Sequence, residues 1–290
     1  MAYREGDLIG ERYEVQGPLG EGGHGVVYRG VDTLLGSQVA IKCLHADIAS
    51  EPGFKTRFMR EARTMGALSG TSAAQVLDIG KMDGGGMYIV MELVDGVDLE
   101  RYLRQIEAGG GHVPVATLWD LLSPIVATLE VAHARGIVHR DLKPGNIMVL
   151  RASGRGPVRL LDFGLAKDLK ADPLTLDGTV AGSPSYIAPE AWMGKTELID
   201  HRVDVYALGA IVFRALTGAP PFDGRRPMIE LVMEVTRSPR PSLRAARPDL
   251  PFGLDAWTAQ ALAVSPAARF QSVRALWDGF HVALTGRAPA

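Results

Sequence analysis

The sequence predicts an α+β fold in which a small β-rich lobe is followed by a larger, mainly helical lobe. The first ninety residues or so alternate in short runs rich in Val, Ile and Tyr that are separated by glycine turns, which is typical of strands. Beyond about residue 95, apolar residues recur every three to four positions, which indicates helices. The stretch "ELVDGVD" (92–98) joins the two patterns.

Four runs in the first part are predicted to be strands. They are "GVVYRGVD" (25–32), "SQVAIKCL" (37–44), "AAQVLDIGK" (73–81) and "MYIVMEL" (87–93), with "LLGS" and "DGGG" as turns. One helix interrupts them over 52–68, where Phe54, Phe58, Ala62 and Met65 recur at helical spacing.

Three segments of the second part have the strongest helical pattern: 116–136, 201–218 and 269–286. Pro124 lies inside the first and should kink it, because proline has no backbone N–H to donate. The other two end at glycines, which are good C-terminal stops.

Composition limits the kind of protein. With 290 residues and 47% hydrophobic content, the chain can bury one large core or two smaller ones. A net charge of −2 provides no basic footprint, so we expect no nucleic-acid partner. The single cysteine, Cys43, excludes an internal disulfide and suits a reducing cytosol.

The N-terminal sequence and the length of the apolar runs indicate where in the cell the protein is expected. The charged start "MAYREGDLIGERYEV" has no apolar core of a signal peptide. We find no run of about 18 apolar residues, and the longest candidate, "VYALGAIVF" (205–213), is too short to cross a bilayer. We therefore expect a cytoplasmic protein without a membrane segment in this chain.

A glycine-rich turn occurs early, in "LGEGGHGVVY" (19–28), with the spacing Gly20-x-Gly22-x-x-Gly25-x-Val27. A dinucleotide site would need a helix directly after the glycines, whereas a strand pattern follows here. A strand–turn–strand hairpin instead lays backbone N–H groups over phosphates. An ordinary hairpin is the alternative that stays open.

Lys42 ends "VAIK" (39–42) in an apolar strand, where an unpaired ammonium is costly. Glu61 lies on the apolar side of the predicted helix 52–68 and also needs a partner. We expect these two residues to pair and to hold the α- and β-phosphates of a nucleotide. A purely structural ion pair is the alternative.

The only asparagine of the chain, Asn146, lies in "HRDLKPGN", and Asp162 follows in "LLDFGLAK". A turn residue would be the simplest explanation for Asn146. With Asp162, however, its amide could supply oxygen ligands to Mg²⁺ beside substrate phosphates. Asp141 could then accept the proton of an attacking hydroxyl, and Lys143 could neutralise the γ-phosphate. We interpret His139 as a core histidine.

In chain order, the glycine turn, "VAIK", the helix glutamate, "HRDLKPGN", "DFG" and "APE" (188–190) make the chain resemble a protein kinase, in the style of the bacterial eukaryotic-like serine/threonine kinases. The resemblance covers about Tyr13 to Leu284. It implies a bilobal protein-kinase-like fold: a lead over 1–12, a kinase domain over 13–285 and a short end over 286–290. Within the domain, the N-lobe would be about 13–92, the hinge about 92–98 and the C-lobe about 99–285.

The resemblance also implies roles for individual residues. Lys42 and Glu61 would form the ion pair of the active state, with Asp141 as catalytic base beside Lys143, and Asn146 and Asp162 as metal ligands. ATP and Mg²⁺ would be the cofactors, with Mn²⁺ as a substitute metal. The nucleotide-binding residues would be Leu19, Gly20, Gly22, Gly25, Val27, Ala40, Lys42, Met91, Glu92, Val94, Asp98 and Met148.

Among these, the adenine would lie between Val27 and Ala40 on one side and Met148 on the other. Glu92 and Val94 would offer hinge backbone bonds. Met91 would be the gatekeeper, and Asp98 would contact the ribose.

The substrate class follows from two details of the resemblance. Tyrosine kinases usually lack the lysine of "DLKPGN", and Ser183 stands where the family keeps a small hydroxyl residue. Both favour protein substrates with a Ser or Thr acceptor. The resemblance further implies a buried Glu190–Arg269 pair and Asp204 as an anchor of the catalytic loop. Phe270 departs from the family pattern, in which proline is commoner.

A loop switch is the last expectation from the resemblance. The polar stretch 168–190 should be ordered by phosphorylation, with Thr179 as the first candidate and Thr175 as the second. Three cations would receive the phosphate: Arg140, Lys167 and Arg57. A second copy of the chain would be the partner for this autophosphorylation.

Two other classes of function remain as alternatives. A pseudokinase scaffold usually has a lesion at Lys42, Asp141, Asn146 or Asp162, and the sequence has none. A small-molecule phosphotransferase on a related fold generally lacks a segment like "GSPSYIAPE".

Overall fold

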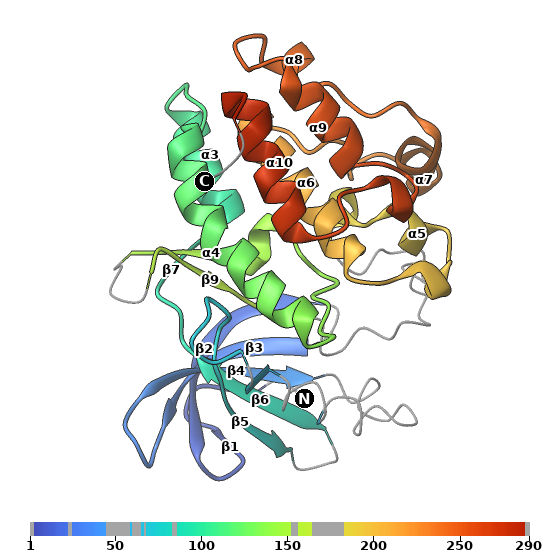
Figure 1. Cartoon of the computed structure of the whole chain (residues 1–290). Helices are drawn as coiled ribbons and strands as arrows, with labels where there is room; N and C mark the ends of the chain where they lie inside the picture. The colour runs from blue at the N-terminus through green and yellow to red at the C-terminus, as the bar shows by residue number, and fades with distance from the viewer. Residues whose placement is uncertain are drawn as a thin grey trace. The chain divides into compact units, whose positions relative to one another are not determined.

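The computed structural model describes residues 3–22, 25–44, 59, 65–66, 68–82, 86–151, 156–163 and 183–287. The chain divides into two compact units, Met1–Asp95 and Gly96–Ala290 (Figure 1). The boundary falls within the stretch 92–98. The first unit is rich in strands and the second is mainly helical, which confirms the predicted α+β class.

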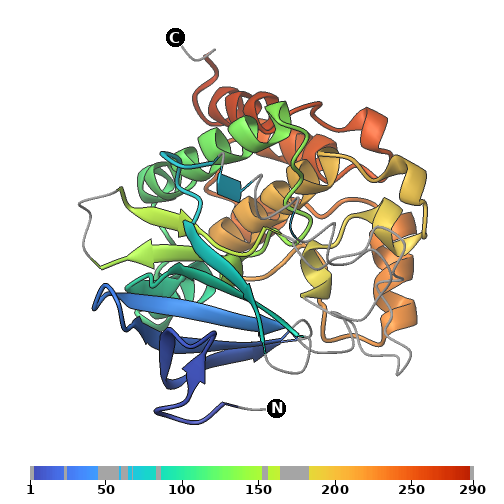
Figure 2. The ribbon, with the colours of Figure 1, turned by 90° about the horizontal axis from the view of Figure 1, so that it is seen from below.

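The first unit contains an antiparallel sheet with the strand order β1-β2-β3-β4-β6-β5 (Figure 2). Its strands are β1 (Leu8–Ile9), β2 (Tyr13–Gly22), β3 (Gly25–Asp32), β4 (Gln38–Leu44), β5 (Val76–Lys81) and β6 (Met87–Glu92). The four predicted strands are all present, with ends that differ by at most three residues. The predicted helix 52–68 lies mostly outside the described residues.

In the first unit, the strands β1 and β2 were not predicted from the sequence. The sequence of β2, "YEVQGPLGEG", holds four residues that weaken a strand pattern, three glycines and a proline. It forms a strand because it pairs along its length with β3, and register shifts at Val15/Gly17 and Pro18/Gly20 accommodate the irregular residues.

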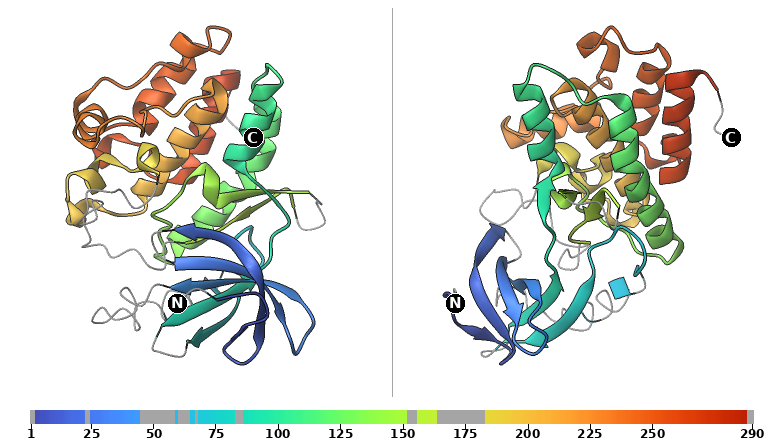
Figure 3. Two further views of the ribbon diagram at one scale, coloured as in Figure 1. Left: turned by 180° about the vertical axis from the view of Figure 1, so that it is seen from behind. Right: turned by 90° about the vertical axis from the view of Figure 1, so that its left-hand side faces the viewer.

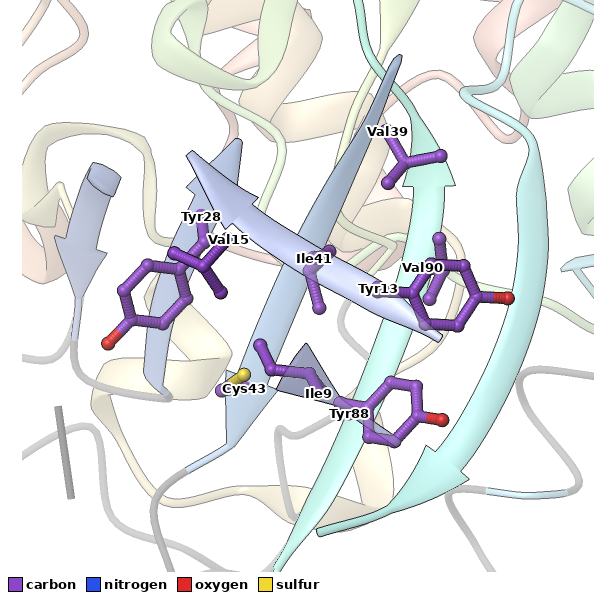
Figure 4. Close-up of a cluster of buried hydrophobic side chains, with 9 residues drawn as sticks. All are labelled: Ile9, Tyr13, Val15, Tyr28, Val39, Ile41, Cys43, Tyr88 and Val90. Atoms are coloured by element: carbon purple, nitrogen blue, oxygen red, sulfur yellow. The ribbon is translucent and has the colours of Figure 1, made fainter. Parts of the chain in front are cut away.

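One face of this sheet carries a cluster of buried side chains, drawn in Figure 4. The Tyr13 and Tyr88 rings meet edge to face with centroids 6.0 Å apart, and the Tyr13 hydroxyl donates to Asp78 Oδ2 at 2.6 Å. Cys43 belongs to the same cluster, and burial raises the pKa of its thiol to about 12. The thiol is therefore protonated and unreactive at neutral pH.

The second unit combines helices with a small sheet of order β7-β8-β9. Its strands are β7 (Gly96–Asp98), β8 (Ile147–Leu150) and β9 (Val158–Leu160). Its helices are α3 (Leu99–Ala108), α4 (Val115–Ala134), α5 (Pro189–Trp192), α6 (Arg202–Thr217), α7 (Met228–Arg237), α8 (Leu243–Ala246), α9 (Gly253–Ala261) and α10 (Val273–Thr285). Single 3₁₀ turns are η1 (Pro144–Asn146), η2 (Pro184–Tyr186), η3 (Thr196–Leu198) and η4 (Pro266–Ala268).

Helix α6 is the centre of this unit. Every residue from Val203 to Leu216 is buried, which is the pattern of a helix surrounded by other elements on all sides. It ends at Gly218, whose φ of +82° suits glycine and whose N–H donates to the Arg214 carbonyl. The predicted helix over 201–218 is thus confirmed to within one residue at each end.

Helix α4 continues through Pro124 and lies beside α10 (Figure 3). The Trp119 and Trp277 rings stack with centroids 4.4 Å apart, and Trp277 Nε1 donates to Ser123 Oγ at 3.1 Å. Among the described residues, α4 is the one helix long and apolar enough to span a membrane. Asp120 and Glu130 interrupt its apolar run, which is why a search for an unbroken run of about 18 apolar residues does not select it.

The predicted ion pair between Glu190 and Arg269 is present and fully buried. Arg269 Nη1 and Nη2 donate to the two carboxylate oxygens at 2.8 and 2.5 Å. Its remaining N–H groups donate to backbone carbonyls of Ala263, Arg202 and Val264. All five donors of the guanidinium are thereby used, which is what a buried arginine requires.

Replacing Arg269 with Met should lower the free energy of unfolding by about 3–5 kcal/mol, because Glu190 is left as a buried unpaired charge. The matched control is Arg274→Met, since Arg274 also binds both carboxylate oxygens of a glutamate, Glu130, but at the surface. That change should cost about 0–1 kcal/mol. Urea unfolding measures both, and equal losses would contradict the role given to burial.

Candidate active site

The loop 139–146 lies between α4 and β8 and carries three residues of the predicted site, Asp141, Lys143 and Asn146. Arg140 has a φ of +63°, a conformation that costs a residue with a Cβ about 1–2 kcal/mol. The loop then ends in the turn η1, where the Asn146 N–H donates to the Lys143 carbonyl at 3.0 Å. The chain leaves η1 as β8, and the Leu161 N–H donates to the Asn146 carbonyl at 2.8 Å.

Within this loop, Asp141, Lys143 and Asn146 contact one another. Lys143 Nζ lies 2.8 Å from Asp141 Oδ2. Asn146 Nδ2 donates to the Asp141 carbonyl at 2.7 Å and to Asp141 Oδ2 at 3.0 Å. The amide nitrogen is thus used to hold Asp141, which turns the amide oxygen to the opposite side. Only a neutral carboxamide offers both groups, since an aspartate here would repel Asp141.

Asp162 follows β9, whose three residues are all buried. It has a φ of +48°, a region that Asp tolerates better than most residues. The next residue, Phe163, is buried against the His139 ring at 4.7 Å between centroids. Strand β9 and this ring contact therefore fix the backbone on both sides of the Asp162 carboxylate.

The oxygens of Asn146 and Asp162 are the donor set that fits Mg²⁺, which is usually held by one or two carboxylates together with substrate phosphates. Within the described part of the chain, no three His, Cys, Asp or Glu side chains gather into a metal site. A zinc-type centre of that kind is therefore not formed by those residues, whereas a two-ligand site completed by phosphates needs no such cluster.

Asp204, in the first turn of α6, holds the loop 139–146 in place. It is 1% exposed and accepts from the His139 and Arg140 N–H groups at 2.8 and 2.9 Å. His133 Nε2 lies 2.8 Å from the same carboxylate. Burial alone would raise the pKa of Asp204, but the hydrogen bond and charge of His133 hold that pKa below its ordinary value. The predicted loop anchor is present.

His139 is itself fully buried, and burial lowers its pKa, so the ring is neutral. Its Nε2 lies 2.9 Å from the Leu161 carbonyl, and its Nδ1 accepts from the Asp141 N–H at 3.3 Å. These bonds require Nε2 to carry the proton. The ring supports the backbone of Asp141, which agrees with the interpretation of His139 as a core residue.

In the first unit, strand register places four predicted nucleotide contacts on one face of the sheet. Val27 pairs with Lys42, and Ala40 pairs with Met91. Cross-strand partners point to the same side, as do residues two apart in a strand. The cluster of Figure 4 uses residues of intervening positions and therefore takes the opposite face.

The glycine turn joins β2 to β3. Gly25 has a φ of +149°, and a Cβ there would meet the Cys43 carbonyl oxygen at 2.0 Å, so only glycine fits. Gly20 pairs with Val27, and a Cβ on it would meet nothing within 4 Å. Gly22 pairs with Gly25 at the end of β2, and Leu19 is partly exposed on the same strand.

The remaining residues predicted to bind the nucleotide lie in or near the ends of strands. Glu92 closes β6, and its N–H and carboxylate both bind Gln75. Val94 follows it in the last residues of the first unit. In the second unit, Asp98 pairs with Met148 across β7 and β8. Asp98 also caps α3, because its Oδ1 accepts from the Arg101 N–H at 2.9 Å.

Some predicted residues lie outside the described part of the chain. They are Glu61, Arg57, Lys167, Thr175 and Thr179. Arg140, predicted to join Arg57 and Lys167, is described, and its buried Nε has no hydrogen-bond partner within the described part of the chain. Sequence reasoning missed His133, whose position in the last turn of α4, six residues before His139, was the available signal.

The Asp204 carboxylate makes loop stability depend on pH. Its folded pKa lies below the ordinary value of 3.8, so its contribution is fully present above that pH and is lost as pH falls through the folded pKa. Asp204→Asn should lower the free energy of unfolding by about 2–4 kcal/mol at pH 7. In urea unfolding, the gap between the two proteins should narrow below pH 3.8, and a constant gap would contradict this.

Known proteins resemble this chain along most of its length. The chain is 36% identical to the probable serine/threonine-protein kinase PknB of Corynebacterium glutamicum over 91% of its residues. It is 38% identical to the serine/threonine-protein kinase PksC of Streptomyces coelicolor over 93% of its residues, and 36% identical to PknA of Mycobacterium tuberculosis over its whole length. It spans 41%, 49% and 65% of these relatives.

A solved structure of a kinase domain is also similar to this chain. The crystal structure of the Mycobacterium tuberculosis PknI kinase domain matches with a TM-score of 0.74 and 30% identity, covering 97% of this chain and 99% of that chain. The family model described as "Protein kinase domain" matches residues 13–251. The order of motifs, the fold and these similarities lead to one conclusion: the chain belongs to the protein kinase family.

Proposed function

We propose that this chain transfers the γ-phosphate of ATP to Ser and Thr hydroxyls of proteins. The observation that carries the proposal is the arrangement of Asp141. Its backbone is supported by His139, its carboxylate contacts Lys143 and Asn146, and the loop around it is tied to Asp204. The names of the related serine/threonine-protein kinases support the same activity.

In this proposal, Asp141 accepts the proton of the attacking hydroxyl. Lys143 lies 2.8 Å from the same carboxylate, so its ammonium can move with little displacement to the γ-phosphate and neutralise charge there. Such a reaction depends on positioning and electrostatics rather than on covalent chemistry by the protein. Held at two points by Asn146, Asp141 is preorganised for that task.

The ATP contacts that the family resemblance implies in the first unit are Lys42, Val27, Ala40 and Met91 on one sheet face, with backbone N–H groups of the glycine turn over the phosphates. In the second unit they are Asp98 and Met148. Asn146 and Asp162 would bind Mg²⁺, or Mn²⁺ in its place, and a bound divalent ion supplies neutralisation of the phosphate charge. Lys42 and Glu61 would form the ion pair that holds the α- and β-phosphates.

Preference for Ser and Thr is supported by Lys143 and by Ser183, which directly precedes η2. We propose in addition that phosphorylation by a second copy regulates the chain, with Thr179 first and Thr175 second. The buried Nε of Arg140 has no hydrogen-bond partner among the residues that the structure describes, which supports a binding role for this guanidinium together with Arg57 and Lys167. We also propose a cytoplasmic location, because a chain with a single cysteine forms no internal disulfide and suits a reducing compartment.

The activity is tested by comparing the parent with Asp141→Asn in Mg²⁺-ATP. We expect kcat to fall about 10²–10⁴-fold because the general base is lost, while KM for ATP stays within about twofold because the residue does not bind ATP. ADP release and phosphoprotein mass spectrometry are the measurements. A parent without turnover would indicate a pseudokinase scaffold, and phosphate on a small alcohol but on no protein would indicate a small-molecule phosphotransferase.

The switch is tested with Thr179→Ala, starting from protein treated with a phosphatase. After incubation with Mg²⁺-ATP, the parent should gain phosphate in the stretch 168–190 and its rate should rise about tenfold. The variant should gain little, with Thr175→Ala as the matched control of smaller effect. Full activation of the Thr179→Ala variant would reject this part of the proposal.

A further inference from the structure

One buried charge has no part in the chemistry proposed above. Arg214, in the last turn of α6, is 3% exposed. Its Nη1 donates to Glu107 Oε1 at 2.5 Å, and its Nη2 donates to Glu100 Oε1 at 2.9 Å and to Glu107 Oε2 at 3.1 Å. Burial alone would lower the pKa of Arg214, but these two carboxylates raise it. The guanidinium is therefore always charged.

Both carboxylates come from α3. Glu100 is in its first turn and Glu107 in its last, seven residues later, so they lie two turns apart on one side of the helix. Arg104, between them, also donates to Glu100 Oε1 at 2.9 Å. One guanidinium thus fixes α3 near both of its ends, which sets the direction of the helix as well as its distance from α6.

The direction of α3 matters because of the residue that begins it. Asp98 is the N-cap, two residues before Glu100, and its Oδ1 binds the Arg101 N–H. On its other side, Asp98 is the last residue of β7 and pairs with Met148. A rotation or shift of α3 would therefore move the Asp98 carboxylate, while β7 and β8 would hold its backbone.

Stability alone is a weak reason for such an arrangement. Apolar residues of similar volume often replace a buried ion pair without loss of stability. A planar guanidinium that binds two carboxylates in a fork does, however, impose a geometry that apolar packing does not. What the charged arrangement provides beyond burial is a defined position for α3.

We propose that Arg214 is a positioning residue for the nucleotide, which places the Asp98 carboxylate at the ribose by fixing α3 against α6. The inference rests on the proposed function, because the ribose contact of Asp98 belongs to it. It adds a residue that lies more than a hundred positions along the chain from the one it positions.

The test is the binding of four proteins to ATP, 2′-deoxy-ATP and 3′-deoxy-ATP with Mg²⁺, measured by calorimetry. The parent should bind at least one deoxy nucleotide about fivefold more weakly than ATP, the effect of one lost hydrogen bond. In Arg214→Met, the Kd for ATP should rise about fivefold and the preference for the ribose hydroxyl should disappear. Arg214→Lys keeps the charge but not the forked guanidinium, so its Kd for ATP and its ribose preference should lie between those of the parent and Arg214→Met.

Arg274→Met is the matched control, because it breaks a bidentate pair between α10 and α4 without touching α3. Its nucleotide preference should equal that of the parent. Should Arg214→Met fail to fold, Glu107→Gln replaces it, since this variant keeps the bond between Arg214 and Glu100 and should show a smaller change in the same direction.

The outcomes separate the inference from the proposed function. A melting temperature lowered in Arg214→Met with an unchanged ribose preference would overturn the inference and leave a merely structural ion pair. Equal binding of ATP and both deoxy nucleotides by the parent would overturn it as well. Failure of phosphate transfer would overturn the proposed function alone, because nucleotide binding is measured without turnover.

Discussion

The arrangement of the candidate active site depends on one buried carboxylate. Asp204 accepts the N–H groups of His139 and Arg140 and contacts His133, and through these bonds it sets the path of the loop that carries Asp141. The loop needs such support, because Arg140 adopts a backbone conformation that it would not adopt alone. A charge without solvent is tolerated because each oxygen is satisfied.

Helix α6 carries a second buried charge that also holds a neighbouring element in place. Its acid, Asp204, lies in the first turn and its base, Arg214, in the last, so each charge also interacts favourably with the helix dipole. The two lie ten residues apart, which is about 15 Å along the axis. Because Asp204 binds the loop 139–146 at one end of the buried helix and Arg214 binds α3 at the other, α6 can fix the position of that loop relative to α3.

Much of this could be predicted from the sequence, because strands, the α6 pattern and the catalytic motifs are local signals. The Lys143–Asp141–Asn146 contacts follow from a six-residue stretch. What could not be predicted depends on distant partners. Strand β2 is stabilised by β3 despite its glycines and proline, and Arg214 finds its glutamates more than a hundred residues earlier, a spacing that no periodicity reports.

The glycines of the glycine turn differ in how much space surrounds them, so they should differ in how readily they are substituted during evolution. A side chain at Gly25 would clash with the Cys43 carbonyl of the neighbouring strand, so the sheet itself requires glycine at this position. A related protein that no longer bound phosphate would therefore still retain it. Among the described residues, none lies within 4 Å of a Cβ placed on Gly20, so none of them would resist its replacement. If the proposed function holds, retention of Gly20 in related proteins would therefore indicate nucleotide binding, whereas retention of Gly25 would indicate only that the sheet is intact.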